Sequence, residues 1–388
     1  MNTDSRMDDK KIAFIGWNPF QFYHIQPALI KIPNARFILE MRRGREKYFD
    51  NEILDKYSDK IIKVNYSEIG DLDGDFSTVV CQTPFTHIHR FEKTRIAMIQ
   101  YGYAKEPHNY GAWRVLADLN MVYGSYAAER IEPLSPVRIV GNPLFDEWCS
   151  HLFHYSSRIR LAPYIKPSRK TLLYAPTWGD LSTLKEHINE VISLSDDFNV
   201  FIKLHHNTEI LERFKNSEWR HNRNVHFFGS SVRLVELMTV TDLVISDYSG
   251  AIFDAILCQR PVILINISTP LASEKLDEFS LEYSRRADLG RVLTGKYNLR
   301  AEVYDVLKNH KIEVAQVDSF RSNLFLIKEG VADRIALSLE ELDKGVLIPT
   351  SSQIYLRQEI RELFRYRSRY QTSLFKRMIN SLINRITR

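Results

Sequence analysis

The stretch VISDYSGAIFDAIL, residues 244–257, is the most informative part of this chain. A β-branched apolar run ends in the polar turn Ser-Asp-Tyr-Ser-Gly, and a helical pattern begins at once. A strand, a tight turn and a helix in this order are typical of a parallel α/β sheet. Free backbone N–H groups at the start of a helix attract anions. Ser249 is a good N-cap there and Gly250 lets a phosphate approach the backbone, so the turn predicts a phosphate site. The alternative is an ordinary connection between a strand and a helix.

Two earlier strands also end in polar residues. Residues 171–180, TLLYAPTWGD, indicate a buried strand that opens into a polar loop, and residues 199–207, NVFIKLHHN, indicate a strand with a cationic tip. In an open parallel sheet, ligands bind outside the carboxyl ends of the strands. We therefore expect the three strand ends to form one site. The predicted donor-binding residues are Thr177, Trp178, Asp180, Lys203, Asn207, Ser246, Ser249, Gly250 and Asp254.

Two further residues of these segments are predicted to be catalytic. Histidine titrates near neutral pH, so His205 suits phosphate binding or protonation of a leaving group. Asp247 is expected to orient the site, while Asp254, one turn into the helix, reaches sugar hydroxyls. Fixed cations and N–H donors stabilise a leaving phosphate by themselves, so we expect neither a metal nor another cofactor.

The same segments resemble a known family. LLYAPTW, KLHHN and DYSGAIFDA, in this order and at this spacing, are similar to the donor-site motifs of the CDP-glycerol glycerophosphotransferases. Those are bacterial teichoic-acid and capsule polymerases. Looser echoes at residues 138–146 and 324–335 extend the resemblance over residues 80–340. It implies an α/β glycosyltransferase-B (GT-B) architecture, with two Rossmann-like domains that face each other across a cleft holding the active site.

Three positions depart from the family's pattern. The family usually has a His-Gly pair after a strand of the first domain, and that histidine is thought to be the acceptor base. Here the pair is Tyr101-Gly102, and His108 is the first alternative for the base. Gly179 stands where the family has arginine, and His206 stands where it has proline. The resemblance thus implies a retained nucleotide-diphosphate pocket and leaves the acceptor base open.

Strands and helices alternate twice along the chain. We expect an acceptor domain over residues 1–150, a linker over 151–169, a nucleotide-donor domain over 170–345 and a basic helical tail over 346–388. The loop after the first strand belongs at the sheet edge that binds ligands, although such an aromatic-rich loop can instead pack in the core. The predicted acceptor-side residues are Trp17, Asn18, His24, Tyr101 and Gly102.

Composition sets the broad class of protein. The 388 residues are 44% apolar and 26% charged, which is ordinary for a folded globular protein. The three cysteines are well separated and odd in number, so they indicate reduced thiols and not a disulfide framework. The sequence shows neither an N-terminal signal segment nor an apolar run of about 18 residues, so we expect no membrane span. No G-x-G-x-x-G occurs, so a dehydrogenase is not indicated.

The C-terminal segment is strongly basic. Residues 351–388 hold nine Lys and Arg against two Glu, within a chain whose net charge is only +5. Residues 373–388 show a continuous apolar stripe at helical spacing with basic residues opposite. Such a helix can lie in an anionic membrane surface, pack on the protein or on a second copy, or bind nucleic acid. Nucleic acid is the least favoured partner because the rest of the chain is slightly acidic.

These observations converge on one function with two alternatives. We expect a transferase that moves glycerol phosphate, or a related polyol phosphate, from a CDP-linked donor to a cell-surface polymer or lipid-linked acceptor. The first alternative is a GT-B glycosyltransferase that uses a UDP- or CMP-sugar. The second is a catalytically silent nucleotide-binding scaffold. The expected location is the cytoplasm, peripheral on the inner face of the plasma membrane.

Overall fold

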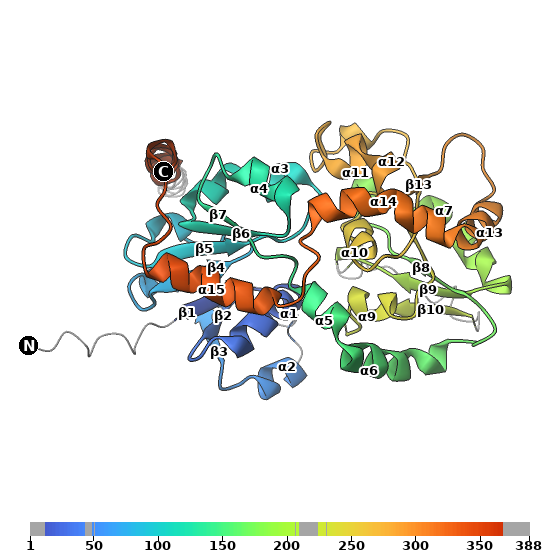
Figure 1. Cartoon of the computed structure of the whole chain (residues 1–388), viewed down its shortest axis with the longest axis horizontal. Coiled ribbons are helices and arrows are strands. Elements are labelled where there is room, and N and C mark those ends of the chain that lie inside the picture. The colour runs from blue at the N-terminus through green and yellow to red at the C-terminus, as the bar shows by residue number, and fades with distance from the viewer. Residues whose placement is uncertain are drawn as a thin grey trace, which may run out of the picture. The chain divides into compact units, whose positions relative to one another are not determined.

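Two compact units make up the chain. The computed structural model describes residues 12–42, 49, 51–205, 207–208, 224–229 and 231–367 of the sequence. The first unit holds Met1–Tyr101, Ala112–Val140 and Ala332–Arg388, and the second holds Gly102–Gly111 and Gly141–Val331. Each unit is an α/β structure built on one parallel sheet (Figure 1). The two units are not consecutive stretches of sequence, unlike the predicted domains. Residues 102–111 belong to the second unit, and the C-terminal part of the chain belongs to the first.

The first unit contains a seven-stranded sheet with the order β3-β2-β1-β4-β5-β6-β7. Its strands are β1 (Ile12–Gly16), β2 (Arg36–Met41), β3 (Ile61–Asn65), β4 (Thr78–Cys81), β5 (Arg95–Ile99), β6 (Leu119–Val122) and β7 (Val137–Ile139), and all pairs are parallel. The central strands are continuous apolar runs because helices bury both faces of a parallel sheet. The strand order reverses between β1 and β4.

Helices α1 (Pro19–Lys31), α2 (Asn51–Lys56) and α4 (Ser125–Ile131) each lie between two consecutive strands of this sheet. A fourth helix, α15 (Val331–Asp343), follows the second unit along the chain. Helix α1 begins because the side chain of Asn18 accepts a hydrogen bond from the N–H of Gln21 at 2.9 Å, with Pro19 at the first helical position. Asn18, predicted on the acceptor side, is therefore a helix cap.

The described part of the C-terminal segment packs on the first unit. Residues 351–367 are helical, and Phe364 packs against the apolar core. The guanidinium of Arg357 pairs with the half-buried carboxylate of Asp118. The predicted amphipathic helix of residues 373–388 lies outside the described residues. Basic side chains of this segment thus help to hold the first unit together.

The second unit contains a six-stranded sheet with the order β10-β9-β8-β11-β12-β13. Its strands are β8 (Thr171–Tyr174), β9 (Asn199–Lys203), β10 (Val225–Phe228), β11 (Leu243–Ser246), β12 (Val262–Leu264) and β13 (Arg291–Val292), and all pairs are parallel. The strand order runs one way from β8 to β10 and the other way from β11 to β13. This reversal creates a topological switch point between β8 and β11.

Ten helices of the second unit are described. They are α3 (Glu106–Asn109), α5 (Leu144–Cys149), α6 (His151–Leu161), α7 (Leu184–Ser193), α9 (Leu234–Met238), α10 (Ala251–Leu257), α11 (Leu281–Ser284), α12 (Arg286–Leu289), α13 (Leu299–Lys308) and α14 (His310–Leu324). Apolar residues of α7 and α13 share one core cluster with β8, β9 and β11, so both helices cover the same face of the sheet. Helix α10 follows β11 directly and also contacts β12 and α14.

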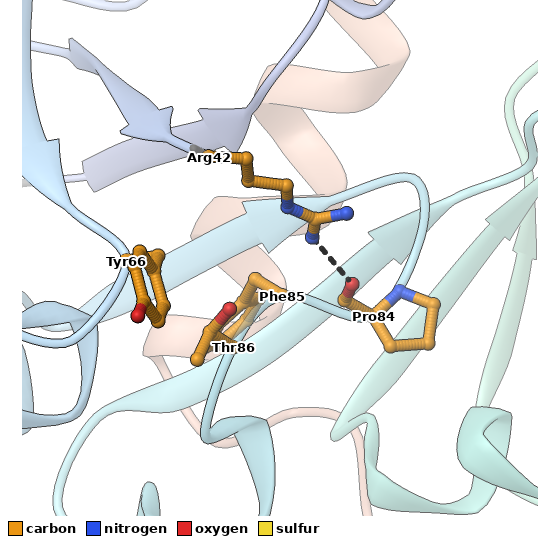
Figure 2. A pocket seen from close by; sticks show the side chains of 5 residues that line it. All are labelled: Arg42, Tyr66, Pro84, Phe85 and Thr86. Atoms are coloured by element: carbon orange, nitrogen blue, oxygen red, sulfur yellow. Dashed lines mark hydrogen bonds between the residues drawn. The ribbon is translucent and has the colours of Figure 1, made fainter. Parts of the chain in front are cut away.

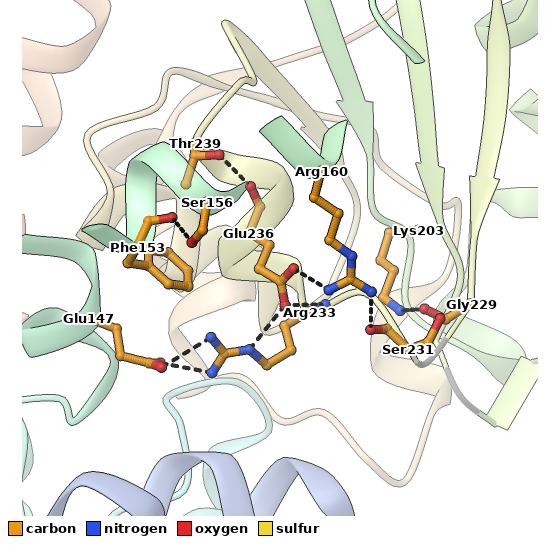
Figure 3. A network of polar contacts seen from close by, with 10 residues as sticks. All are labelled: Glu147, Phe153, Ser156, Arg160, Lys203, Gly229, Ser231, Arg233, Glu236 and Thr239. Atoms are coloured by element: carbon orange, nitrogen blue, oxygen red, sulfur yellow. Dashed lines mark hydrogen bonds and ion pairs between the residues drawn. The ribbon is translucent and has the colours of Figure 1, made fainter. Parts of the chain in front are cut away.

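Figure 3 shows an ionic network that joins α5, α6 and α9. Arg233 donates to the carboxylate of Glu147 at 2.8 and 3.0 Å and to that of Glu236 at 3.2 Å. Glu236 also accepts from Arg160 on α6 at 2.8 Å. Burial opposes the charge on Arg233, but the two carboxylates outweigh it and raise its pKa. The predicted linker of residues 151–169 therefore begins with a helix that is tied into the second unit.

Among the described residues, no helix is both long and apolar enough to cross a membrane. Cys81, Cys149 and Cys258 are free cysteines, and Cys81 and Cys258 are buried. Burial raises the pKa of the Cys81 thiol to about 12, so this cysteine is an apolar core residue of β4.

Candidate active site

The polar site lies at the switch point of the second sheet. β8 pairs with β9 on one side and with β11 on the other, and all three strands run parallel. The segments that follow them, residues 175–183, 203–205 and 247–250, therefore meet at the carboxyl edge of the sheet, where α/β proteins bind ligands. The three segments expected from the sequence to form the site are at this edge.

Asp247 joins two of these segments. Its carboxylate is fully buried and accepts from the backbone N–H groups of Thr177 at 2.8 Å, Thr183 at 2.9 Å and Tyr248 at 2.7 Å. The hydroxyl of Thr183 adds a fourth bond at 3.1 Å. Burial raises the pKa of Asp247, while these donors oppose the rise by favouring the charged form. The predicted catalytic role is corrected, because this geometry makes Asp247 a structural residue that holds the site together.

The turn after β11 combines buried and accessible residues. Ser246 is fully buried and its hydroxyl donates to the carbonyl of Ala175 at 2.7 Å. The prediction that Ser246 contacts the nucleotide donor is therefore corrected: its side chain links two strand ends. The hydroxyl of Ser249 accepts from the first residue of α10 at 3.3 Å. Gly250 is exposed, with φ −58°, and a Cβ built on it would lie 4.0 Å from the Cβ of Ala104. Local packing therefore does not require glycine at this position.

Asp254 lies on α10, one turn beyond Gly250. Among the described residues, its carboxylate accepts no hydrogen bond, and the side chain is partly exposed. Burial of the carboxylate raises its pKa to about 7. A partly exposed carboxylate with unused acceptor capacity can bind ligand hydroxyls, which is the role the sequence predicts.

Trp178 contacts both a lysine and a histidine. The Nζ of Lys275 lies 4.0 Å from the centroid of the indole ring, and His205 stacks on the ring at a centroid distance of 5.9 Å. Lys275 also binds the carboxylate of Asp180 at 2.8 Å, and this contact is the main cause of the lowered pKa of Asp180. The Nδ1 of His205 accepts from the N–H of Asn207 at 3.2 Å, which orients the imidazole. The side chains of Trp178, Lys275, Asp180 and His205 thus form one cluster, and the backbone N–H of Asn207 contacts it.

Lys203 is the last residue of β9. Its ammonium donates to the carbonyl of Gly229, in the loop after β10 (Figure 3). The carbonyl of Ser231, in the same loop, accepts from Arg160 at 3.0 Å. Figure 3 shows both bonds. The loop after β10 is thus held by two cations, one of which is a predicted donor-binding residue.

Two lysines of the site were missed by sequence reasoning. The Nζ of Lys105 donates to the hydroxyl of Thr177 at 3.2 Å, and Lys275 covers Trp178. Lys275 lies in a segment without any recognisable pattern. Lys105 follows the predicted pair Tyr101–Gly102 closely, but only the three-dimensional structure assigns it to the second unit.

His108 lies on the same short segment as Lys105. It is exposed on α3, and its backbone N–H donates to the carbonyl of Lys105 at 2.9 Å. The predicted acceptor base is therefore accessible to solvent and belongs to the second unit.

The acceptor-side residues of the first unit divide into buried and accessible ones. His24 is buried on α1, with its Nδ1 3.1 Å from the amide nitrogen of Gln82 and 3.4 Å from the hydroxyl of Tyr123. The prediction that His24 contacts an acceptor is therefore wrong, since the residue belongs to the core beneath the sheet edge. Tyr101 ends the first of the three segments of the first unit, and its ring lies 5.3 Å from that of Phe20.

A hollow of about 470 Å³ lies at the carboxyl edge of β2, β3 and β4 (Figure 2). It is lined by Arg42, Tyr66, Pro84, Phe85 and Thr86. The guanidinium of Arg42 lies 4.9 Å from the ring of half-buried Trp17, so this hollow borders one of the predicted acceptor-side residues. Gly102, the other accessible one, begins the second unit, and a Cβ placed on it would meet no described atom within 4 Å outside its chain neighbours.

Two Rossmann-like parallel sheets, the second with a polar site at its switch point, define the GT-B class of proteins. Residues 132–339, more than half of the chain, match the family CDP-Glycerol:Poly(glycerophosphate) glycerophosphotransferase, and the chain belongs to this family. The matched span includes every segment of the second-unit site except the one that carries Lys105 and His108.

Individual relatives are distant. The chain is 24% identical over 198 residues to the teichoic acid poly(glycerol phosphate) polymerase of Staphylococcus epidermidis, which covers 46% of this chain and 26% of that protein. It is also 24% identical over 193 residues to the teichoic acid poly(ribitol-phosphate) polymerase of Bacillus spizizenii, covering 46% and 29%. The chain therefore spans less than a third of the length of these two curated relatives.

A solved structure confirms the fold. The structure of the wall teichoic acid polymerase TagF, as a variant soaked with CDPG, matches 87% of this chain and 90% of that chain. The TM-score is 0.62 at 18% sequence identity. The GT-B fold expected from the sequence is thus confirmed.

Proposed function

We propose that this protein transfers glycerol phosphate, or a related polyol phosphate, from a CDP-linked donor to a cell-surface polymer or lipid-linked acceptor. The observation that carries the proposal is the cluster at the switch point of the second sheet. There Thr177, His205 and Gly250 follow three neighbouring parallel strands. Membership of the glycerophosphotransferase family and the names of the two curated relatives support this reaction class.

The donor binds with its diphosphate at the turn after β11. Ser249 and Gly250 present backbone N–H groups there, and exposed glycine lets phosphate oxygens approach. Helix α10 has only seven residues, so most of the charge stabilisation falls to side chains such as Lys203 and His205. The carboxylate of Asp254 accepts from the ribose hydroxyls. Trp178, Asp180 and Asn207 complete the donor side.

The chemistry is a displacement at phosphorus. A hydroxyl of the acceptor attacks the β-phosphorus of the donor, and the bond from this phosphorus to the bridging oxygen breaks. CMP leaves with the electron pair of that bond, and cations at the strand ends stabilise its charge. The hydroxyl proton passes to a base, for which exposed His108 is the proposed residue. His205 binds or protonates the leaving phosphate.

The acceptor side is proposed for the first unit and for the start of the second. Trp17, Tyr101 and Gly102 are the accessible residues among those predicted, and the hollow beside Arg42 offers space for a polyol or sugar unit. We further propose that the protein acts at the inner face of the plasma membrane. The basic amphipathic pattern of residues 373–388 supports that location.

The test is nucleotide release by purified protein. Wild-type protein given CDP-glycerol and an acceptor polyol-phosphate polymer is expected to release CMP, and His205→Ala is expected to slow this release by about a hundredfold. His151→Ala, an exposed histidine on α6, is the matched control and should leave the rate unchanged. Equal rates for wild type and His205→Ala contradict the role of His205. Turnover with a UDP-sugar instead favours the glycosyltransferase, and binding without turnover favours the silent scaffold.

A further inference from the structure

The segment Gly102–Gly111 is set apart from its sequence neighbours. It lies between β5 and β6 of the first sheet, yet it belongs to the second unit. The hydroxyl of Tyr103 donates to the carbonyl of Leu324, and the Tyr103 ring lies 5.5 Å from that of Phe253 and 5.4 Å from that of Phe325. These contacts are buried, so the segment is fixed on the second unit next to α10.

Lys105 is aimed from this segment at the strand-end cluster. Its backbone is in the left-handed region, with φ 64°, and its N–H donates to a carboxylate oxygen of Glu282 at 2.6 Å. Its Nζ donates to the hydroxyl of Thr177 at 3.2 Å. The neighbouring residue Ala104 carries the atom nearest to a Cβ built on Gly250. The ammonium therefore lies at the same edge as the proposed phosphate turn.

The ammonium of Lys105 is poorly compensated in this position. Among the described residues, no carboxylate lies within ion-pair distance of Nζ, although Glu282, Asp247 and Asp180 are near enough to favour the charged form. Burial lowers the pKa of Lys105, and the positive charge of nearby Lys275 lowers it further. Lys275 is paired with Asp180, whereas the ammonium of Lys105 is bonded to a hydroxyl, so an anionic ligand would complement the charge of Lys105.

We propose that Lys105 binds the diphosphate of the nucleotide donor and stabilises the negative charge on the leaving nucleotide phosphate. The inference rests on the proposed function and adds a cation that none of the recognised motifs contains. It also explains why a segment from between two strands of the first sheet is anchored on the second unit. The bond to Thr177 orients the ammonium before the donor arrives.

Calorimetric titration of Lys105→Met tests the proposal. Affinity for CDP-glycerol and for inorganic pyrophosphate should fall about ten- to a hundredfold, the range expected when a hydrogen bond to a charged group is lost. Affinity for cytidine, which has no phosphate, should be unchanged. Lys105→Arg keeps the charge and should recover part of the affinity. The control is Lys170→Met, which removes a lysine paired with Asp242 at the opposite edge of the same sheet.

Two results overturn the proposal. One is wild-type affinity of Lys105→Met for both CDP-glycerol and pyrophosphate. The other is an equal loss of affinity for cytidine, which indicates a purely structural role. The titration with pyrophosphate separates this inference from the proposed function. If the wild-type protein prefers a UDP-sugar, CDP-glycerol transfer is refuted, but the pyrophosphate affinity of Lys105→Met still tests the role of Lys105.

A second measurement needs no variant and covers the case in which Lys105→Met does not fold. Wild-type protein is treated with a lysine-acylating reagent with and without pyrophosphate, and each lysine is quantified by mass spectrometry. Pyrophosphate should protect Lys105 at least severalfold and leave Lys170 unprotected. Equal acylation of Lys105 in both samples contradicts the inference.

Discussion

The carboxylate of Asp247 accepts a hydrogen bond from the backbone N–H of Thr177 at 2.8 Å, and so ties the end of β8 to the end of β11. Thr177 in turn accepts a hydrogen bond from Lys105 through its hydroxyl. A buried acid thus fixes the backbone of a residue whose side chain faces the proposed ligand. The strand-end cluster is held in shape by the protein before any ligand binds.

Asp247→Asn is expected to destabilise the protein. The amide nitrogen of asparagine cannot accept the bonds from the Thr183 N–H and hydroxyl, and the charge that strengthens all four bonds is lost. The free energy of unfolding should fall by about 2–4 kcal/mol in urea titrations. Thr183→Val removes the hydroxyl alone and should cost about 1 kcal/mol. Unchanged stability of Asp247→Asn together with abolished turnover would restore the catalytic role that the structure argues against.

Donor affinity is expected to depend on pH through Asp254. The charged carboxylate is the better acceptor for ribose hydroxyls, and its pKa is raised to about 7. Affinity for CDP-glycerol should therefore rise as the pH increases through about 7. Asp254→Asn should bind more weakly and lose this part of the pH dependence in calorimetric titrations at pH values on both sides of 7. An identical pH profile for the variant contradicts the assignment.

Ionisation of Asp254 should lower the stability of the fold, although it favours donor binding. The folded-state pKa of this carboxylate, about 7, is above the ordinary value of 3.8, so the folded state binds the proton more tightly than the unfolded state. Ionisation therefore costs stability as the pH rises from 3.8 to about 7. The free energy of unfolding of the wild type, relative to that of Asp254→Asn, should decrease over this interval. A constant difference across this pH range would show that the pKa of Asp254 is not raised.

Gly250→Ala should separate folding from donor binding. The backbone conformation suits any residue, and the added Cβ would lie at ordinary contact distance from Ala104. The thermal unfolding midpoint should stay the same, whereas affinity for CDP-glycerol should fall about tenfold because the methyl group obstructs the phosphate. Gly290→Ala is the contrasting case, since its Cβ would lie 2.5 Å from the carbonyl of Val262 and should destabilise the fold. Unchanged affinity of Gly250→Ala places the phosphate elsewhere.

The helix of residues 351–367 should be released by loss of one arginine. Arg357 pairs with Asp118 and also donates to the carbonyls of Val115 and Ala117. Arg357→Ala should expose this helix to chymotrypsin and accelerate its cleavage in limited proteolysis. Arg365→Ala is the control, because exposed ion pairs contribute little to stability. Equal cleavage of both variants would show that Arg357 does not anchor the helix.

The second sheet and its site segments follow closely from the sequence. Segments such as TLLY and LVIS are largely apolar and fully buried, and each is followed by the turn and polar residues that end a parallel strand. The strand order then brings these polar ends to one edge. The GT-B fold could therefore be predicted from pattern and resemblance together.

The direction of individual polar side chains could not be predicted. Ser246, Asp247, Ser249 and Asp254 are all polar residues of one strand–turn–helix stretch, but the first two are fully buried and the last is partly exposed. The backbone path through the turn decides which of these side chains are buried. The segment is too short for a periodic sequence pattern to predict that path. His24 was expected in the loop after the first strand, but it lies on helix α1 and is buried there.

The assignment of segments to the two units could also not be predicted from local sequence patterns. Residues 102–111, which include Lys105 and His108, look in the sequence like an ordinary loop after β5. Long-range contacts of Tyr103 nevertheless assign this loop to the second unit. Helix α6 was not predicted, because the basic residues of this segment suggested a linker. Both cases depend on contacts between residues far apart in the chain.

A crystal structure of the protein with CDP-glycerol bound is the most direct test of where the donor binds. We expect the diphosphate within hydrogen-bond distance of the backbone N–H of Gly250 and of the Nζ of Lys105, with the ribose against Asp254. A diphosphate bound away from all three residues, for example in the hollow beside Arg42, would contradict the account.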